Sequence, residues 1–143
     1  MIAASPGKNS IRIAVAGVLY FVIGYGSTLL DHPFSGQVHF WRLAAWIASA
    51  VVYLTHLSHE YFRLRRPPLS AASRVALAVA AGGFLLAVQA TAHAAMVYQH
   101  APYGRLLIAW IAWPLITGVP AFLFAVVVTT ILRWLGIPHL AET

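Results

Sequence analysis

The stretch LLIAWIAWPLITGVPAFLFAVVVTTIL, residues 106–132, decides the fold. It contains no charged residue, and Arg105 and Arg133 lie directly on either side of it. A helix needs about 20 predominantly apolar residues to cross the hydrocarbon core of a bilayer. The stretch therefore predicts a transmembrane helix over about residues 105–134.

Three further apolar stretches precede this one and predict three more transmembrane helices, over about residues 11–30, 41–62 and 72–98. The first is expected to end before Pro33, because proline disfavours helix at the preceding residue. Ser70 is a plausible N-cap for the third helix. The first stretch is too long for a signal peptide and no A-x-A-like cleavage site follows it, so we expect it to be retained.

The composition of the whole chain agrees with a membrane protein. Its 143 residues are 61% hydrophobic and 8% charged, whereas soluble domains are typically about a quarter charged. The cationic residues lie at the ends of the apolar stretches and form no clustered basic surface, so nucleic acid is not an expected partner. Cysteine is absent, which excludes disulfides and thiolate metal sites.

The positions of the cationic residues predict the orientation of the helices, because cytoplasmic loops carry an excess of lysine and arginine. A cytoplasmic N-terminus places seven cations inside: Lys8, Arg12, Arg63, Arg65, Arg66, Arg74 and Arg133. It leaves two outside: Arg42 and Arg105. Both termini are therefore predicted to be cytoplasmic. The abundance of arginine and alanine points to a bacterial inner membrane.

Short connections of about 6 to 10 residues favour antiparallel neighbours. The predicted fold is an all-α integral membrane protein, one domain over residues 1–143, in which four transmembrane helices form an up-down bundle. Helices associate in lipid through close contact of small residues. The third helix carries a face of such residues and is expected to be the most buried; they are Ala76, Ala80, Gly83, Ala87, Ala90 and Ala94. Gly17 and Gly24 offer a narrower face on the first helix.

Pro114 and Pro120 are expected to kink the fourth helix, because proline cannot donate a backbone hydrogen bond. Thr117, which lies between them, could bond to the backbone groups that the bend loosens. Such a kink would either serve the packing of helices or form a hinge or the wall of a cavity.

Polar groups inside a membrane are costly, and each is a candidate site. Gln89, His93, Met96 and His100 follow helical spacing and predict one polar stripe on the outer half of the third helix. The loop after the first helix contains Asp31, His32 and His39, and all three are expected on the same outer side. His93, His100, His32 and His39 could together bind a metal, a haem or a chlorophyll-type pigment. Interfacial histidines bonded to their neighbours are the structural alternative.

A second group lies at the inner end of the second helix. His56, His59, Glu60 and Arg63 share one broad helix face. A carboxylate beside two imidazoles could relay protons or bind a cation. The structural alternative is an ion pair between Glu60 and Arg63. The order H-x-x-H-E is not the zincin pattern, in which two histidines enclose the glutamate, so metal-dependent hydrolysis is not expected.

A third group, Tyr53 with Thr55 and Gln89, lies near mid-membrane, where such side chains more often join helices than bind ligands. The histidines of the second and third helices differ in depth and cannot share one haem if both helices are regular.

Three functions remain open. The first is a non-catalytic accessory or assembly subunit of a larger membrane complex, or a self-associating bundle. The second is a cofactor-binding subunit of an electron-transfer or photosynthetic complex. The third is a dimeric proton-coupled transporter that uses Glu60 and His56. The sequence contains no recognisable nucleophile–base pair, paired carboxylates or phosphate-binding loop, so catalysis is not the expected role.

Overall fold

The computed structural model describes residues 6–31, 38–97 and 103–135, and long helices form nearly all of these ranges. The helices are α1 (Pro6–Asp31), α2 (Val38–Ser58), α3 (Pro68–Val97) and α4 (Tyr103–Trp134), and a π-helical turn, η2 (His59–Arg63), continues α2. Four of these elements are long and apolar enough to cross a membrane, by length and composition, over Ser10–Leu29, His39–Arg63, Pro68–Val97 and Leu106–Trp134. The structure confirms the prediction of an all-helical chain with four helices of this kind.

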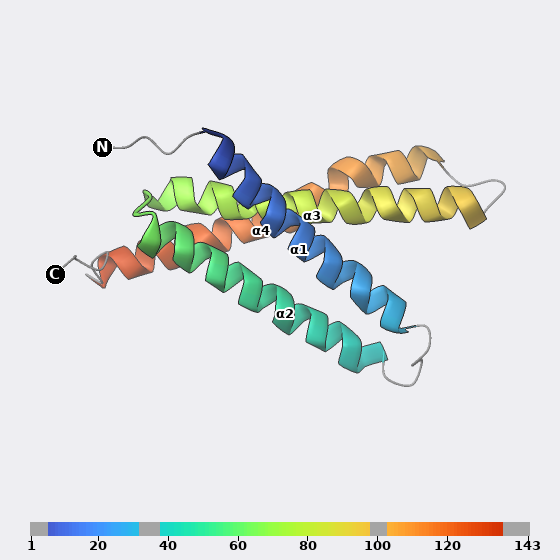
Figure 1. The fold of residues 1–143 in the computed structure, drawn as a ribbon, viewed down its shortest axis with the longest axis horizontal. Helices are drawn as coiled ribbons and strands as arrows, with labels where there is room; N and C mark the ends of the chain where they lie inside the picture. The colour runs from blue at the N-terminus through green and yellow to red at the C-terminus, as the bar shows by residue number, and fades with distance from the viewer. Residues whose placement is uncertain (1–5, 32–37, 98–102, 136–143) are drawn as a thin grey trace.

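Successive helices run antiparallel and form two hairpins, α1–α2 and α3–α4 (Figure 1). The hairpins converge where α1 and α3 begin and where η2 and α4 end. We call this the arginine-rich end, after Arg12, Arg63, Arg65, Arg66, Arg74 and Arg133. At the opposite end the two hairpins diverge, so that the α1–α2 tip and the α3–α4 tip are well separated in Figure 1.

The two hairpins cross where α1 packs on α3 through glycine. A Cβ atom added at Gly82 would lie 2.6 Å from the Cβ of Tyr20 and 3.1 Å from the carbonyl oxygen of Gly17. A Cβ atom at Gly17 would lie 3.0 Å from the Cβ of Ala81. The backbones of α1 and α3 can therefore approach this closely only because neither glycine has a side chain.

The α3–α4 hairpin is closed by a second set of small residues. A Cβ atom added at Gly118 would lie 3.0 Å from the Cβ of Ala80, and one at Gly83 would lie 2.6 Å from the hydroxyl oxygen of Thr117. Gly83 and Ala80 belong to the small-residue face predicted for the third helix. Ala87, farther along that face, is also buried, whereas Ala90 is exposed.

Burial is uneven among the helices. In the most apolar 18-residue stretch of each span, 33% of the α3 residues are buried inside the chain, compared with 6% of the α2 residues. α3 makes its most extensive contacts with α4 and α1, whereas its contacts with α2 are few. The prediction that the third helix is the most buried is confirmed.

Two local features of the helices bear on the sequence predictions. α3 begins at Pro68, two residues before the predicted N-cap Ser70, because proline suits the first position of a helix. In α4 the Thr117 hydroxyl donates to the carbonyl oxygens of Trp113 (2.8 Å) and Pro114 (3.4 Å). Pro114 and Pro120 lie inside α4, and the kink expected there stays a prediction.

Candidate functional site

The chain changes its helical form at the arginine-rich end, where α2 passes into α3. The last turn before the connection is η2, in which Leu64 N–H donates to the carbonyl oxygen of His59 (3.1 Å). π-Helical turns are rare and frequently occur at functional sites. Arg65 then adopts a positive φ of 48°, which is uncommon for a residue other than glycine. The connection therefore reverses the chain within a few residues and returns it toward η2.

This reversal brings a cation onto the carboxylate of Glu60. Arg66 Nε lies 2.8 Å from Glu60 Oε2, and the backbone N–H of Arg66 donates to the carbonyl oxygen of Glu60 (3.4 Å). The Glu60 side chain is 2% exposed and that of Arg66 is 21% exposed. A buried carboxylate needs a compensating partner, because removing a charge from water costs several kcal/mol. Arg66 supplies that partner.

Arg66 is the site residue that the sequence reasoning missed. That reasoning paired Glu60 with Arg63, on the assumption that a regular α-helix continues past Glu60. The structure instead has the π-helical turn and the tight reversal, which place Arg66 on the carboxylate, while Arg63 is exposed. The Pro67-Pro68 pair that follows was the available signal, since it requires the helix to stop and the chain to turn.

His56 lies one turn before Glu60 on the same face. Its Nε2 atom is 3.9 Å from Glu60 Oε1, which is longer than a direct hydrogen bond. Both ring nitrogens are enclosed, and neither has a hydrogen-bond partner in the part of the chain that the structure describes. His59, the other predicted member, is exposed. The structure therefore brings together His56, Glu60 and Arg66, which we call the inner triad.

The net charge of the inner triad is zero or plus one, according to whether His56 is protonated. With His56 neutral, the carboxylate and the guanidinium compensate each other. With His56 protonated, a second cation lies beside the carboxylate within 3.9 Å. Leu57 and Tyr61, which follow His56 and Glu60 in the chain, are buried, and a buried setting strengthens each of these interactions.

The mid-membrane polar group is only partly assembled. The Tyr53 hydroxyl donates to the carbonyl oxygen of Ala121 on α4 at 2.6 Å, so this residue joins helices as expected. Thr55 is exposed and Gln89 is half-buried. Tyr20, which the sequence reasoning did not consider, is buried, and its hydroxyl has no hydrogen-bond partner among the residues that the structure describes.

The histidines predicted for the outer side fall in two groups. His39, near the start of α2, and His93, near the end of α3, are both exposed and belong to hairpins that diverge at this end (Figure 1). His32 and His100 lie outside the described residues. Within the described ranges, no three histidine, aspartate or glutamate side chains lie close enough to hold a metal ion. A metal, haem or pigment site here stays a prediction.

One side of α2 carries a shallow apolar hollow of about 360 Å³. Its lining comes entirely from that helix: Phe40, Leu43, Ala44, Ile47 and Ala48. Ala44 and Ala48 are four residues apart and form the floor, because their side chains are the smallest in the set. We call this hollow the α2 groove.

No protein-family model, curated protein or solved structure matches the chain. The inner triad and the α2 groove are therefore the features from which function is proposed.

Proposed function

We propose that this protein is a non-catalytic multi-pass membrane protein that acts by lateral association in the bilayer. It would serve as an accessory or assembly subunit of a larger membrane complex or as a self-associating bundle. Its setting would be a bacterial inner membrane with both termini cytoplasmic, as the excess of cations at one end favours. The observation that carries the proposal is the α2 groove.

The α2 groove has the composition of a helix-packing surface. Transmembrane helices associate where small residues four apart let two backbones approach closely. The same chain uses glycine and alanine in this way at both of its internal crossings, at Gly82 and at Gly118. Ala44 and Ala48 repeat the spacing on a helix of which only 6% of the most apolar stretch is buried.

Large apolar side chains flank these alanines and would add contact area. Phe40 is 60% exposed and Leu43 is 59% exposed, and both line the groove. A neighbouring helix that enters the groove would therefore contact the alanines at its centre and these side chains at its edges. That arrangement resembles the ridges-into-grooves packing of helices within one chain.

Cysteine cross-linking tests the proposal on a clean background, because the natural chain contains no cysteine. Ala44→Cys and Ala48→Cys are expected to form disulfide-linked dimers in native membranes under mild oxidation, or adducts with a second protein. The matched control is Ala50→Cys, at an exposed alanine of α2 outside the groove. Equal cross-linking at all three positions would contradict association through the groove.

A filling variant adds an independent measurement. Ala48→Leu is expected to reduce cross-linking from Ala44→Cys, because the added side chain occupies the groove and separates the helices. The size of the cross-linked product distinguishes self-association from capture of a different subunit. A homodimer has twice the mass of the 15.5 kDa chain.

A second candidate function is proton-coupled transport by a dimer, and the inner triad is the observation that favours it. Glu60 is 1% exposed within a membrane-length helix, and His56 lies beside it with both ring nitrogens enclosed. Intramembrane carboxylates and histidines commonly mark proton relays.

Proteoliposomes that contain a pH-sensitive dye test this second function. The wild-type protein is expected to dissipate an imposed pH gradient, and both Glu60→Gln and His56→Gln are expected to abolish that activity. Arg63→Gln, at an exposed arginine of η2, is the control that should retain it. A wild-type rate equal to that of empty liposomes would contradict proton conduction through the inner triad.

A further inference from the structure

We infer that the groove between the start of α3 and the end of α4 binds the phosphate of an anionic phospholipid. The groove has a volume of about 530 Å³, within the range of about 300–1,000 Å³ that is usual for ligand sites. The residues that line it are Pro67, Pro68, Leu69, Thr130, Arg133 and Trp134. We call it the α3–α4 groove, and it shares no lining residue with the α2 groove or the inner triad.

The position of the α3–α4 groove matches the depth of lipid headgroups. The membrane-length stretch of α3 begins at Pro68, and that of α4 ends at Trp134. Both ends therefore meet the level at which hydrocarbon gives way to polar headgroups. Trp134 is 89% exposed, and tryptophan is enriched at this level because its ring is apolar and its N–H is polar.

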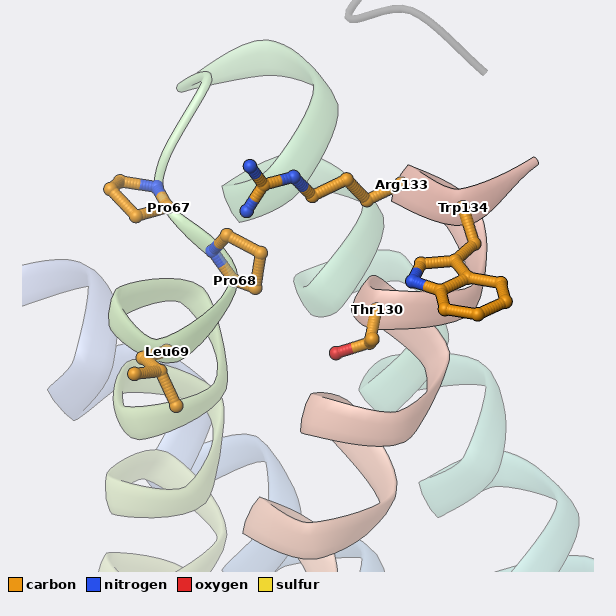
Figure 2. Close-up of a pocket in the computed structure, with 6 residues that line it drawn as sticks. All are labelled: Pro67, Pro68, Leu69, Thr130, Arg133 and Trp134. Atoms are coloured by element: carbon orange, nitrogen blue, oxygen red, sulfur yellow. The ribbon is translucent and has the colours of Figure 1, made fainter. Parts of the chain in front are cut away.

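Arg133 provides the charge that would recognise a phosphate. Figure 2 shows its guanidinium extending from α4 across the groove to the side of Pro67 and Pro68. Arg133 is exposed and has no ion-pair partner among the side chains that the structure describes. The guanidinium can donate two parallel hydrogen bonds to a phosphate, which gives such contacts their strength and geometry.

Two further groups add donors beside Arg133. The Thr130 hydroxyl lies on the groove side of α4 and is directed toward α3 in Figure 2. The first turn of α3 also has backbone N–H groups without a side-chain cap, since Pro67 and Pro68 have no acceptor in their side chains. Ala71 N–H is satisfied by the carbonyl oxygen of Pro67 (3.0 Å).

The surrounding charge favours an anion over a cation. Among the residues that the structure describes at this end, the carboxylate is that of Glu60, and its Oε2 atom already lies 2.8 Å from Arg66 Nε. The remaining described charges at this end are arginines, so a negative headgroup experiences attraction from several directions. Juxtamembrane arginines attract anionic lipids, whereas a zwitterionic headgroup gains much less. The acyl chains of such a lipid would lie along the exposed apolar side of Leu69.

Native mass spectrometry of the full chain tests the inference, with phosphatidylglycerol and phosphatidylcholine as the two probes after mild delipidation. The wild-type protein is expected to retain phosphatidylglycerol in preference to phosphatidylcholine. Arg133→Gln is expected to weaken phosphatidylglycerol binding by about tenfold, which corresponds to roughly 1.4 kcal/mol. Arg12→Gln removes the same charge from an exposed position at the same end and should change binding by less than about twofold.

A second variant tests the shape of the groove independently of the charge of Arg133. Leu69→Trp fills the groove without altering any charged residue and is expected to displace phosphatidylglycerol as Arg133→Gln does. Equal losses in Arg133→Gln and Arg12→Gln, or undiminished binding in Leu69→Trp, would overturn the site. Displacement of phosphatidylglycerol by inorganic phosphate at low millimolar concentration would overturn the choice of lipid as its source. Helical content measured by circular dichroism verifies that each variant is folded.

Discussion

The two ends of the molecule are built from similar apolar helices, yet they are organised in opposite ways. At the arginine-rich end the hairpins converge, and the buried carboxylate of Glu60 is held by Arg66 and flanked by His56. At the opposite end the hairpins diverge, and His93 and Met96 are exposed, the latter to 85%. The difference teaches that apolar composition makes a helix suited to the membrane, whereas small residues and paired charges decide where it packs.

The largest expected effect comes from removing the cation at the convergent end. Arg66→Met leaves Glu60 buried without its partner, and loss of one member of a buried ion pair costs about 3–5 kcal/mol. We expect the loss in free energy of unfolding to lie near the lower end of this range, because the Arg66 side chain is 21% exposed and therefore partly in contact with solvent. Reversible unfolding by detergent titration measures it.

The matched control is Arg63→Met at the same end, where the exposed arginine should contribute less than about 0.5 kcal/mol. The double variant Glu60→Gln with Arg66→Met should recover much of the lost stability, since it removes the uncompensated charge. A double variant as unstable as Arg66→Met alone would show that packing, rather than charge, is responsible.

A smaller loss is expected at the crossing between the two ends. Gly82→Ala places a methyl group 2.6 Å from the Cβ of Tyr20 and 3.1 Å from the backbone of Gly17, neither of which can move freely. Overpacking of this kind costs about 1–3 kcal/mol. Gly26→Ala is the control, because no atom lies within 4 Å of its added Cβ, and there alanine should be neutral or slightly stabilising. Detergent titration measures the free energy of unfolding of both variants. Equal losses in Gly82→Ala and Gly26→Ala would contradict the close contact of α1 with α3.

A loss of about 0.5–1.5 kcal/mol is expected from Tyr53→Phe, which removes the 2.6 Å hydrogen bond to Ala121 on α4. The value should fall near the lower limit, since hydrogen bonds between transmembrane helices average about 0.6 kcal/mol. Tyr25→Phe provides the comparison. The ring of Tyr25 stacks on that of Phe21 with 5.7 Å between the ring centroids, and phenylalanine keeps this contact. Losses of the same size in both variants would argue against the link between α2 and α4.

The smallest effect is expected at the divergent end. His93→Ala should change the free energy of unfolding of the isolated chain by less than about 0.5 kcal/mol, because the side chain is exposed. Detergent titration again measures it. A loss above about 1 kcal/mol would mean that a ligand retained by the purified chain covers His93, and would favour the predicted cofactor site.

The features that could be predicted from sequence follow from local patterns. The four spans follow from runs of apolar residues, and the burial of α3 follows from the spacing of Ala80 and Gly83. The sequence also indicated Gly17 on the first helix, but only the structure showed that its partner at the crossing of the hairpins is Gly82, which is not part of the predicted face of the third helix. That pairing depends on which face of each helix meets the other, and a single sequence does not contain this information.

The candidate sites were harder to predict from the sequence, because they too depend on how segments of the chain lie relative to one another. Regular helical spacing correctly associated His56 with Glu60, because both lie on α2 and its continuation. It failed for Arg66, whose position depends on the π-helical turn and on the positive φ of Arg65. It also gave no means of placing His39 relative to His93, since their distance depends on how far the two hairpins diverge.

The glycine crossing has a mechanical consequence. Because α1 and α3 approach closely at Gly17 and Gly82, and Gly24 still lies against Leu86, the parts of the two hairpins beyond these contacts extend as levers. Leu29 lies twelve helical steps beyond Gly17, roughly 18 Å at the rise of an α-helix, so a small rotation at the crossing is magnified at the divergent tips. Lateral pressure or a change in bilayer thickness acting on those tips would be transmitted, with leverage, to the close contact of the two glycines.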